Sequence, residues 1–231
     1  MTAVLIFLLV VAGVSAWWLS HQRLLSKPWL ESGPDTVVEG TDEIGMPKAK
    51  IGLIVFLAVV GTLFALMTSG YLMRQELADW RTLPLPRILW VNTGLLVLGS
   101  ISVHRALIGA RNHDDGPVRF WMVVACVAAL GFLIGQVMAW QQLVNSGFVL
   151  AGNPANSFFY MLTGIHGLHI IGGLVALGRT TAAAWRDVAM DKLRLSIDLC
   201  ALYWHFLLFV WFVLLVVMLG WAHDPFILSN H

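Results

Sequence analysis

Six long apolar segments constrain the fold of this chain more than any other feature of its sequence. A helix needs about 20 mostly apolar residues to cross the hydrocarbon core of a bilayer. With 58% hydrophobic and only 12% charged residues, the chain carries more apolar surface than a soluble core can bury. We therefore predict an all-α fold, a polytopic membrane helix bundle with six transmembrane helices. The segments lie near residues 1–20, 51–73, 88–110, 118–141, 158–178 and 199–222.

The first segment is similar to a secretory signal peptide, because Val14-Ser-Ala16 resembles a small-residue cleavage site. It lacks the basic residues that precede the apolar part of such a signal. We therefore expect an extra N-terminal transmembrane helix at 1–20. A cytoplasmic linker at 21–50 would join it to a five-helix core at 51–222, and residues 223–231 would form a C-terminal tail.

Lysine and arginine are distributed unequally between the two ends of the predicted helices. The segments 21–50, 104–119 and 179–198 together carry eleven of the 14 basic residues, and the alternate connections carry three. Because cytoplasmic loops are enriched in basic residues, the first group is predicted to be cytoplasmic. Both termini then lie on the opposite side of the membrane, in the periplasm or its equivalent. The basic residues are dispersed and the net charge is +1, which excludes a nucleic-acid-binding surface.

The 13 acidic residues all lie in predicted loops or at the ends of predicted helices. Ion-coupled transporters and proton pumps usually carry a carboxylate at mid-membrane depth. The eight prolines also fall in the connections, so the broken helices of many transporters are not expected. These features speak against a transporter.

Four histidines lie within the apolar segments, and two of them, His166 and His169, are three residues apart and so share a helix face. One interpretation is haem ligation, since imidazole is a common axial ligand. A single haem needs ligands on opposite faces, so His205 would have to complete the pair. The alternative is that these imidazoles form hydrogen bonds between helices, each contributing about 1 kcal/mol. The fourth of these histidines is His104. We favour the packing interpretation and expect no metal ligand on this chain.

Small residues surround the histidine pair, and two tryptophans lie two turns apart on one face of the last segment. Glycine in a membrane helix lets a neighbouring helix approach closely. Tryptophans commonly mark membrane interfaces. We therefore expect the 158–178 helix to be a contact helix, and we expect the tryptophans to be packing residues and not part of a cofactor site. The glycines are Gly164, Gly167, Gly172 and Gly173, and the tryptophans are Trp204 and Trp211.

The motif Thr163-Gly-Ile-His-Gly-Leu-His169, followed by Tyr203-Trp-His-Phe206, resembles the signature of subunit III of haem-copper terminal oxidases, the cytochrome c oxidase subunit 3 family. Weaker matches occur in the expected order, and the resemblance covers residues 51–222, the five-helix core of the short bacterial form. The N-terminal helix is additional to that form. The weaker matches include Asn92, Gln136 and Trp140.

The resemblance implies a bundle of two lobes around a lipid-filled cleft, with bound phospholipid and no haem, copper or catalytic residue on this chain. It implies a non-catalytic subunit that stabilises oxidase subunit I by direct contact, with subunit II and a small subunit IV as further partners. Haem and copper would lie on these partners. In this arrangement His166, His169 and His205, with Tyr203 and Trp204, would fix the fifth and sixth predicted helices against each other.

Three positions depart from the family pattern, and all three lose a carboxylate. Val60 and Ala139 stand where the family often has glutamate, and Leu208 stands where it has aspartate. Roles in proton uptake or lipid binding that those carboxylates are suspected of are therefore in doubt for this chain.

Three alternatives stay open at the level of sequence. The chain could be a haem-b membrane cytochrome that anchors a quinol dehydrogenase, which would bind haem by itself. It could be a small transporter or lipid-handling protein, which would be stable and active without partners. It could also be the accessory subunit of a nitric oxide reductase, a relative whose motifs are close to these.

Overall fold

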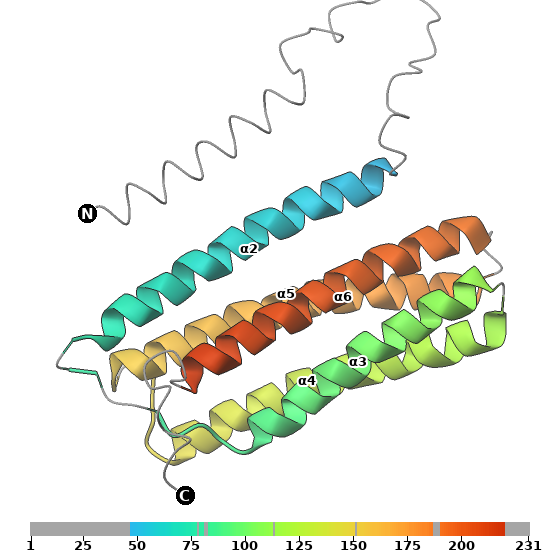
Figure 1. The fold of residues 1–231 in the computed structure, drawn as a ribbon. Coiled ribbons are helices and arrows are strands. Elements are labelled where there is room, and N and C mark those ends of the chain that lie inside the picture. Colours follow the sequence, from blue (N-terminus) through green and yellow to red (C-terminus); the bar gives the residue numbers. More distant parts are fainter. Residues whose placement is uncertain are drawn as a thin grey trace, which may run out of the picture. The chain divides into compact units, whose positions relative to one another are not determined.

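The computed structural model describes five long helices and contains no strand in the part of the chain that it describes (Figure 1). The predicted helix at 1–20, most of the linker and the tail at 223–231 lie outside the described residues. The helices are α2 (Lys48–Gln75), α3 (Ile88–Arg111), α4 (Asp115–Asn145), α5 (Pro154–Ala184) and α6 (Met190–Met218). The described residues are 47–77, 79–80, 83–112, 114–150, 152–186 and 190–219.

α2, α4 and α5 extend at both ends beyond the apolar segments that predicted them. α4 and α5 each contain 31 residues, and at about 1.5 Å per residue they exceed the roughly 30 Å hydrocarbon core. Hydropathy detects only the part of a helix that faces hydrocarbon, whereas the helix continues into the headgroup region. Two predicted starts are therefore wrong: α2 begins at Lys48, within the predicted linker, and α6 begins at Met190 rather than at 199.

The connection between α4 and α5 shows local signals that stop one helix and start the next. Gly147 adopts a φ of 87°, and the Phe148 amide donates back to the Leu143 carbonyl at 2.9 Å, which closes the end of α4. Asn153 then caps α5, since its side chain accepts a hydrogen bond from the amide of Ala155, and Pro154 occupies the first helical position.

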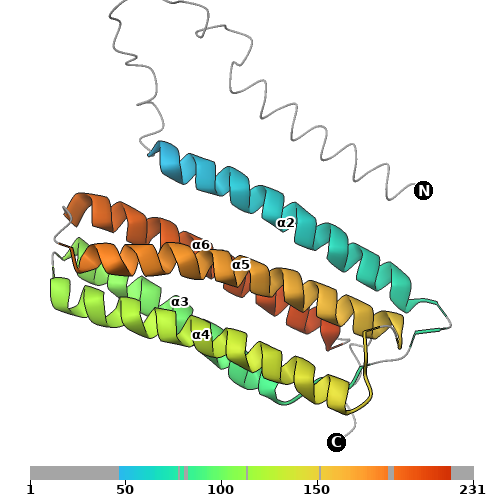
Figure 2. The ribbon, with the colours of Figure 1, turned by 180° about the vertical axis from the view of Figure 1, so that it is seen from behind.

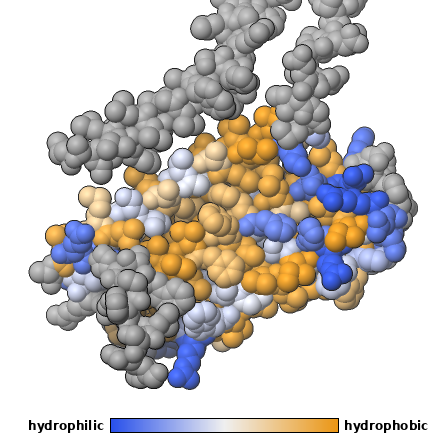
Figure 3. All heavy atoms as spheres, viewed as in Figure 1, coloured by the Kyte–Doolittle hydropathy of each residue, from blue (hydrophilic) through white to orange (hydrophobic). Residues whose placement is uncertain are grey.

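Consecutive helices run in opposite directions, and α3 to α6 form a four-helix bundle in which each helix contacts two others of the four (Figures 1 and 2). α2 contacts α5 and α6 and is the least buried of the five candidate membrane spans. Figure 3 shows a broad hydrophobic band over the bundle and hydrophilic residues at the end where α2 and α6 begin.

The closest helix pair is α3 and α4, and small residues make this possible. A Cβ atom added at Gly99 would lie 3.7 Å from the Ala128 methyl, and one added at Gly109 would lie 3.1 Å from a methyl of Val118. Close approach through small residues is a principal source of helix association in membranes. α3 and α4 therefore use the close approach through small residues that the sequence predicted for the 158–178 helix.

Two apolar clusters fill the interior. The larger lies among α3, α4, α5 and α6 and includes the fully enclosed Phe132 and Trp211. The smaller joins α2 to α5 and α6 through residues such as Phe64, Leu162 and Val210. The histidine motif of α5 lies between the two clusters, where all three of its neighbouring helices reach it.

Candidate functional site

Polar side chains from four helices meet inside the α3–α6 bundle. Asn92 of α3 donates to the Gln136 amide oxygen of α4 at 3.3 Å. The Trp211 indole of α6 donates to the Thr93 hydroxyl of α3 at 2.9 Å. Residues that matched the family only weakly in sequence, Asn92 and Gln136, thus lie in one buried layer and bond to each other.

The same layer includes the start of the histidine motif. The Trp140 indole of α4 donates to the Thr163 hydroxyl at 3.1 Å, and this hydroxyl donates to the Phe159 carbonyl one turn earlier in α5. Indole–hydroxyl pairs therefore supply two of the side-chain hydrogen bonds between helices in this layer, beside the Asn92–Gln136 amide pair. Composition gave no signal for the pairing, because the partners are distant in sequence.

His166 lies between the two apolar clusters and is fully buried. Its ring contacts Trp211, Phe132 and Phe64, with centroid distances of 5.2, 5.8 and 6.1 Å. Neither ring nitrogen has a hydrogen-bond partner among the described residues. The prediction of an interhelical hydrogen bond from His166 is therefore wrong, and the ring acts through aromatic contacts. Phe64 and Phe132, which complete this cage, were not identified from sequence.

His169 and His205 also do not bond across helices. The Nδ1 atom of His169 bonds to the Ile165 carbonyl at 2.8 Å, and that of His205 bonds to the Ala201 carbonyl, each within its own helix. A side chain can satisfy the backbone carbonyl four residues earlier, so neither imidazole needs a partner on a neighbouring helix.

A phenol forms the hydrogen bond that joins α5 to α6 in this region. The Tyr203 hydroxyl donates to the His169 carbonyl at 2.9 Å. A Cβ atom added at Gly173 would lie only 2.6 Å from Cε1 of Tyr203, so the phenol ring rests directly on this glycine. Tyr203 therefore joins the fifth and sixth predicted helices, as expected, and it does so by packing on Gly173. His166 contributes to the same contact through its ring, which lies 5.2 Å from that of Trp211, and not through a hydrogen bond.

The other glycines of α5 differ from Gly173. Added Cβ atoms at Gly164 and Gly172 would make ordinary contacts at 3.9 Å, with Trp140 and Tyr203. An added Cβ at Gly167 would meet nothing within 4 Å, although the residue is buried. The expectation that Gly167 admits a close neighbour is therefore wrong.

His205 faces away from α5. It is exposed on the outer surface of α6, and its ring lies 5.8 Å from that of His104 on α3. The role predicted for His205 between the fifth and sixth helices is therefore wrong. Trp204 and Trp211, in contrast, are each only 2% exposed and lie inside the bundle, as the packing interpretation predicted.

His166 and His205 lie in different surroundings. His166 is enclosed by three aromatic rings, whereas His205 is exposed on α6 and its ring neighbours that of His104. The described residues also contain no group of three or more His, Cys, Asp or Glu side chains placed to hold a metal ion.

The three positions without a carboxylate lie in different surroundings. Ala139 is fully buried in the α3–α6 core, and Val60 is buried in the cluster beneath α2. Leu208 is half-buried on α6. Apolar side chains complete the packing at the two buried positions.

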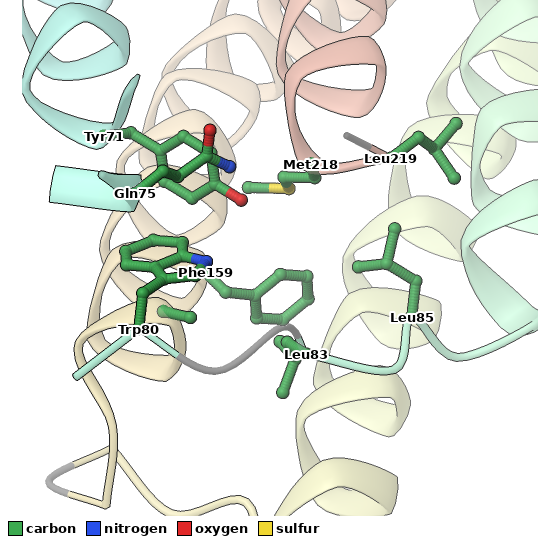
Figure 4. A pocket seen from close by; sticks show the side chains of 9 residues that line it. Tyr71, Gln75, Trp80, Leu83, Leu85, Phe159, Met218 and Leu219 are labelled. Carbon is green, nitrogen blue, oxygen red and sulfur yellow. The ribbon is translucent and has the colours of Figure 1, made fainter. Parts of the chain in front are cut away.

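Two hollows lie where α2 meets the rest of the protein. A groove of about 630 Å³ runs between α2, α5 and α6, and it is mostly apolar, with Phe56, Gly172, Gly173 and Tyr203 in its walls. A smaller cavity of about 270 Å³ lies at the other end of α2 (Figure 4). There the side chains of Tyr71 and Gln75 lie beside each other, above the indole of Trp80.

Comparison with known proteins gives a consistent result. The family model for cytochrome c oxidase subunit III matches residues 81–223. Cytochrome c oxidase subunit 3 of a Synechocystis species is 27% identical over 75% of this chain and 76% of its own length. Proteins called probable cytochrome c oxidase subunit 3 are similar as well. The one from Mycobacterium bovis is 29% identical over 73% of this chain and 85% of its own length, and the one from Mycobacterium leprae is 32% identical over 54% and 62%.

The described part of the chain has five helices long and apolar enough to cross a membrane. Together with the match over residues 81–223, they identify a multi-pass membrane protein. The two sequence motifs and the helices that present them agree with this match. The chain therefore belongs to the cytochrome c oxidase subunit III family.

Proposed function

We propose that this chain is the non-catalytic subunit III of a bacterial respiratory haem-copper oxidase. It contacts subunit I directly and assembles with subunit II and a small subunit IV. The haem and copper lie on these partner subunits. The family match and the names of the relatives support subunit III over the accessory subunit of a nitric oxide reductase and over a haem-b cytochrome anchor.

The non-catalytic role rests on what the residues of the family motif contact. Tyr203 bonds to the backbone of α5 and packs on Gly173, while His166 is enclosed by aromatic rings. The most characteristic residues of the chain thus join helices to one another. Close packing and a few hydrogen bonds are what stabilise a membrane bundle. Such a subunit contributes by holding its partners in place during turnover.

The groove between α2, α5 and α6 supports a role in holding phospholipid. Its volume and its mostly apolar lining suit acyl chains. Gly172 and Gly173 have no side chains that would fill the groove. We propose that this groove forms part of the lipid-filled cleft that the family resemblance implies.

We further propose that the chain crosses the bacterial inner membrane six times and that both termini lie in the periplasm. The basic residues Lys50, Arg111 and Arg194 lie at one end of the described helices, which supports a cytoplasmic location for that end. Fusion of alkaline phosphatase, which is active only in the periplasm, to either terminus should give active enzyme. A fluorescent protein that folds only in the cytoplasm should give signal at neither.

A reduced-minus-oxidised spectrum tests the main proposal. Material purified on a tag carried by this chain should show haem bands, and a harsher detergent that strips the partners should remove them from the tagged chain. His169→Ala should leave the haem bands of the intact complex unchanged. One haem retained per stripped chain, or a band shifted in the variant, would contradict the non-catalytic assignment.

A further inference from the structure

A polar pocket of about 370 Å³ lies at the end of the bundle where α2 and α6 begin and α3 ends. It differs from the other hollows because its lining is mainly charged. Three of the six lining side chains are cations, and one is a carboxylate. The lining residues are Lys50, Leu107, Arg111, Arg194, Leu195 and Asp198.

The single carboxylate is already paired. Lys50 donates to the Asp198 carboxylate at 2.7 Å, and both side chains are partly buried in this bridge between α2 and α6. Arg111 and Arg194 are exposed and form no ion pair with another described residue. The lining therefore has an excess of two positive charges, both of them guanidinium groups, whose planar donors match the oxygens of a phosphate.

The position of the pocket indicates how a phosphate would reach it. Arg111 is the last residue of α3, and Ile108, one turn deeper on the same exposed stripe, is 41% exposed. Ile54, one turn deeper than Lys50 in α2, is 43% exposed. Apolar side chains thus begin about one helical turn below the cations. This order matches that of a phospholipid, in which the acyl chains begin below the headgroup. Figure 3 shows the same boundary between hydrophilic and hydrophobic residues at this end.

We propose that this pocket binds the phosphate group of an anionic phospholipid headgroup. Basic pockets between membrane helices on the cytoplasmic side are suited to such headgroups. The pocket lies on the α3 side of the contact between α2 and α6, whereas the apolar groove lies on the α5 side, so the two sites are separate. The proposal depends on the helices crossing a membrane, not on the location of the redox centres.

The test compares a variant that lacks the two unpaired cations with a control variant that lacks two cations elsewhere. The pocket variant is Arg111→Gln/Arg194→Gln. The control is Arg105→Gln/Lys192→Gln, which removes the same charge from exposed positions of α3 and α6 outside the pocket lining. The purified, delipidated complex is titrated with short-chain phosphatidylglycerol, short-chain phosphatidylcholine and inorganic phosphate, and bound molecules are counted by native mass spectrometry and phosphorus NMR.

The wild-type complex and the control should bind one phosphatidylglycerol per chain more tightly than phosphatidylcholine. The pocket variant should bind it about 30-fold more weakly, the effect expected for two cations near an anionic headgroup. If the wild type and the pocket variant differ in their binding of inorganic phosphate but not of phosphatidylglycerol, the ligand is a free phosphate ion and the headgroup assignment is overturned. Equal binding of every ligand by the pocket variant and the control would overturn the site itself.

Loss of binding is informative only if the complex still assembles. Both double variants should therefore keep the melting temperature and subunit composition of the wild type. If the pocket double variant does not assemble, Arg111→Gln and Arg194→Gln are tested separately, and each should weaken phosphatidylglycerol binding about fivefold. Wild-type binding by both single variants would overturn the proposal.

Discussion

At the scale of single residues, the family motif acts through shape and aromatic contact more than through histidine chemistry. The Tyr203 ring packs on the backbone of Gly173, and the His166 imidazole lies among the aromatic rings of Trp211 and Phe132. An imidazole in a membrane segment predicts a partner or a function. Here His169 and His205 each bond to a backbone carbonyl one turn earlier in their own helix. The spacing of residues in the sequence does not distinguish such a bond from one to a neighbouring helix.

Two glycines of α5 provide a matched pair for testing this arrangement. Gly173→Ala places a methyl 2.6 Å from the Tyr203 ring and should destabilise the protein by about 1–3 kcal/mol through overpacking. Gly167→Ala meets no atom within 4 Å and should stabilise the helix by up to about 1 kcal/mol. Thermal melting of the purified complex measures both changes. Equal melting temperatures for the two variants would show that Tyr203 does not press on Gly173.

At the scale of helices, buried hydrogen bonds connect elements that are far apart in the sequence. The Trp211 indole reaches Thr93, and the Trp140 indole reaches Thr163, so α3 is joined to α6 and α4 to α5. The sequence predicted the five described helices and a packing role for Trp211. It did not predict these partners, because each threonine can satisfy its hydroxyl within its own helix.

Thr93→Val leaves the buried Trp211 indole without its acceptor and should cost about 1–3 kcal/mol. Thr93→Ser keeps the hydroxyl and should retain most of the stability. In a double-mutant cycle with Trp211→Phe, the coupling energy should be about 0.6–1.7 kcal/mol, the range measured for hydrogen bonds between membrane helices. Melting of the assembled complex provides the four free energies. A coupling near zero would show that this hydrogen bond does not join α3 to α6.

The end of α2 supplies a pH-dependent contact. Arg74 donates two hydrogen bonds to the Asp79 carboxylate, at 2.7 and 2.5 Å, and these hold the pKa of Asp79 below its usual range. A carboxyl group whose pKa is lowered by folding stabilises the folded state above its unfolded pKa, about 3.9, and this contribution is lost as the pH falls through the folded value.

The stability difference between the wild type and Asp79→Asn should therefore be present at neutral pH and disappear in acid. It should be small, because Asp79 is exposed. Melting temperatures recorded from pH 7 to the acid limit of the complex measure it. A difference that stays constant over this range would exclude the ion pair as its cause.

At the scale of the whole molecule, the four helices α3 to α6 form the body of the described structure, and α2 contacts only α5 and α6. The apolar groove and the polar pocket both lie along α2, one on each side of its contact with α6. Lipid in these sites would complete the packing of α2.

Removal of lipid should therefore loosen α2 before the rest of the protein. Hydrogen exchange of the complex, followed by mass spectrometry before and after delipidation, should show faster exchange in peptides of α2. Peptides of α3 and α4 should change little, since local opening begins where fewest contacts are buried. A uniform increase across all five helices would indicate that α2 needs no lipid for its packing.

The fold class, the position of the five described helices and the family follow from the amino-acid sequence. Twenty apolar residues have few alternatives to a membrane helix, because every backbone polar group must be satisfied within the segment. The atoms that the histidines contact, the glycine on which Tyr203 packs and the place where unpaired cations gather become known only from the packed helices. These properties depend on how helices rotate about their axes and which of them become neighbours, and a pattern along a single helix does not fix either.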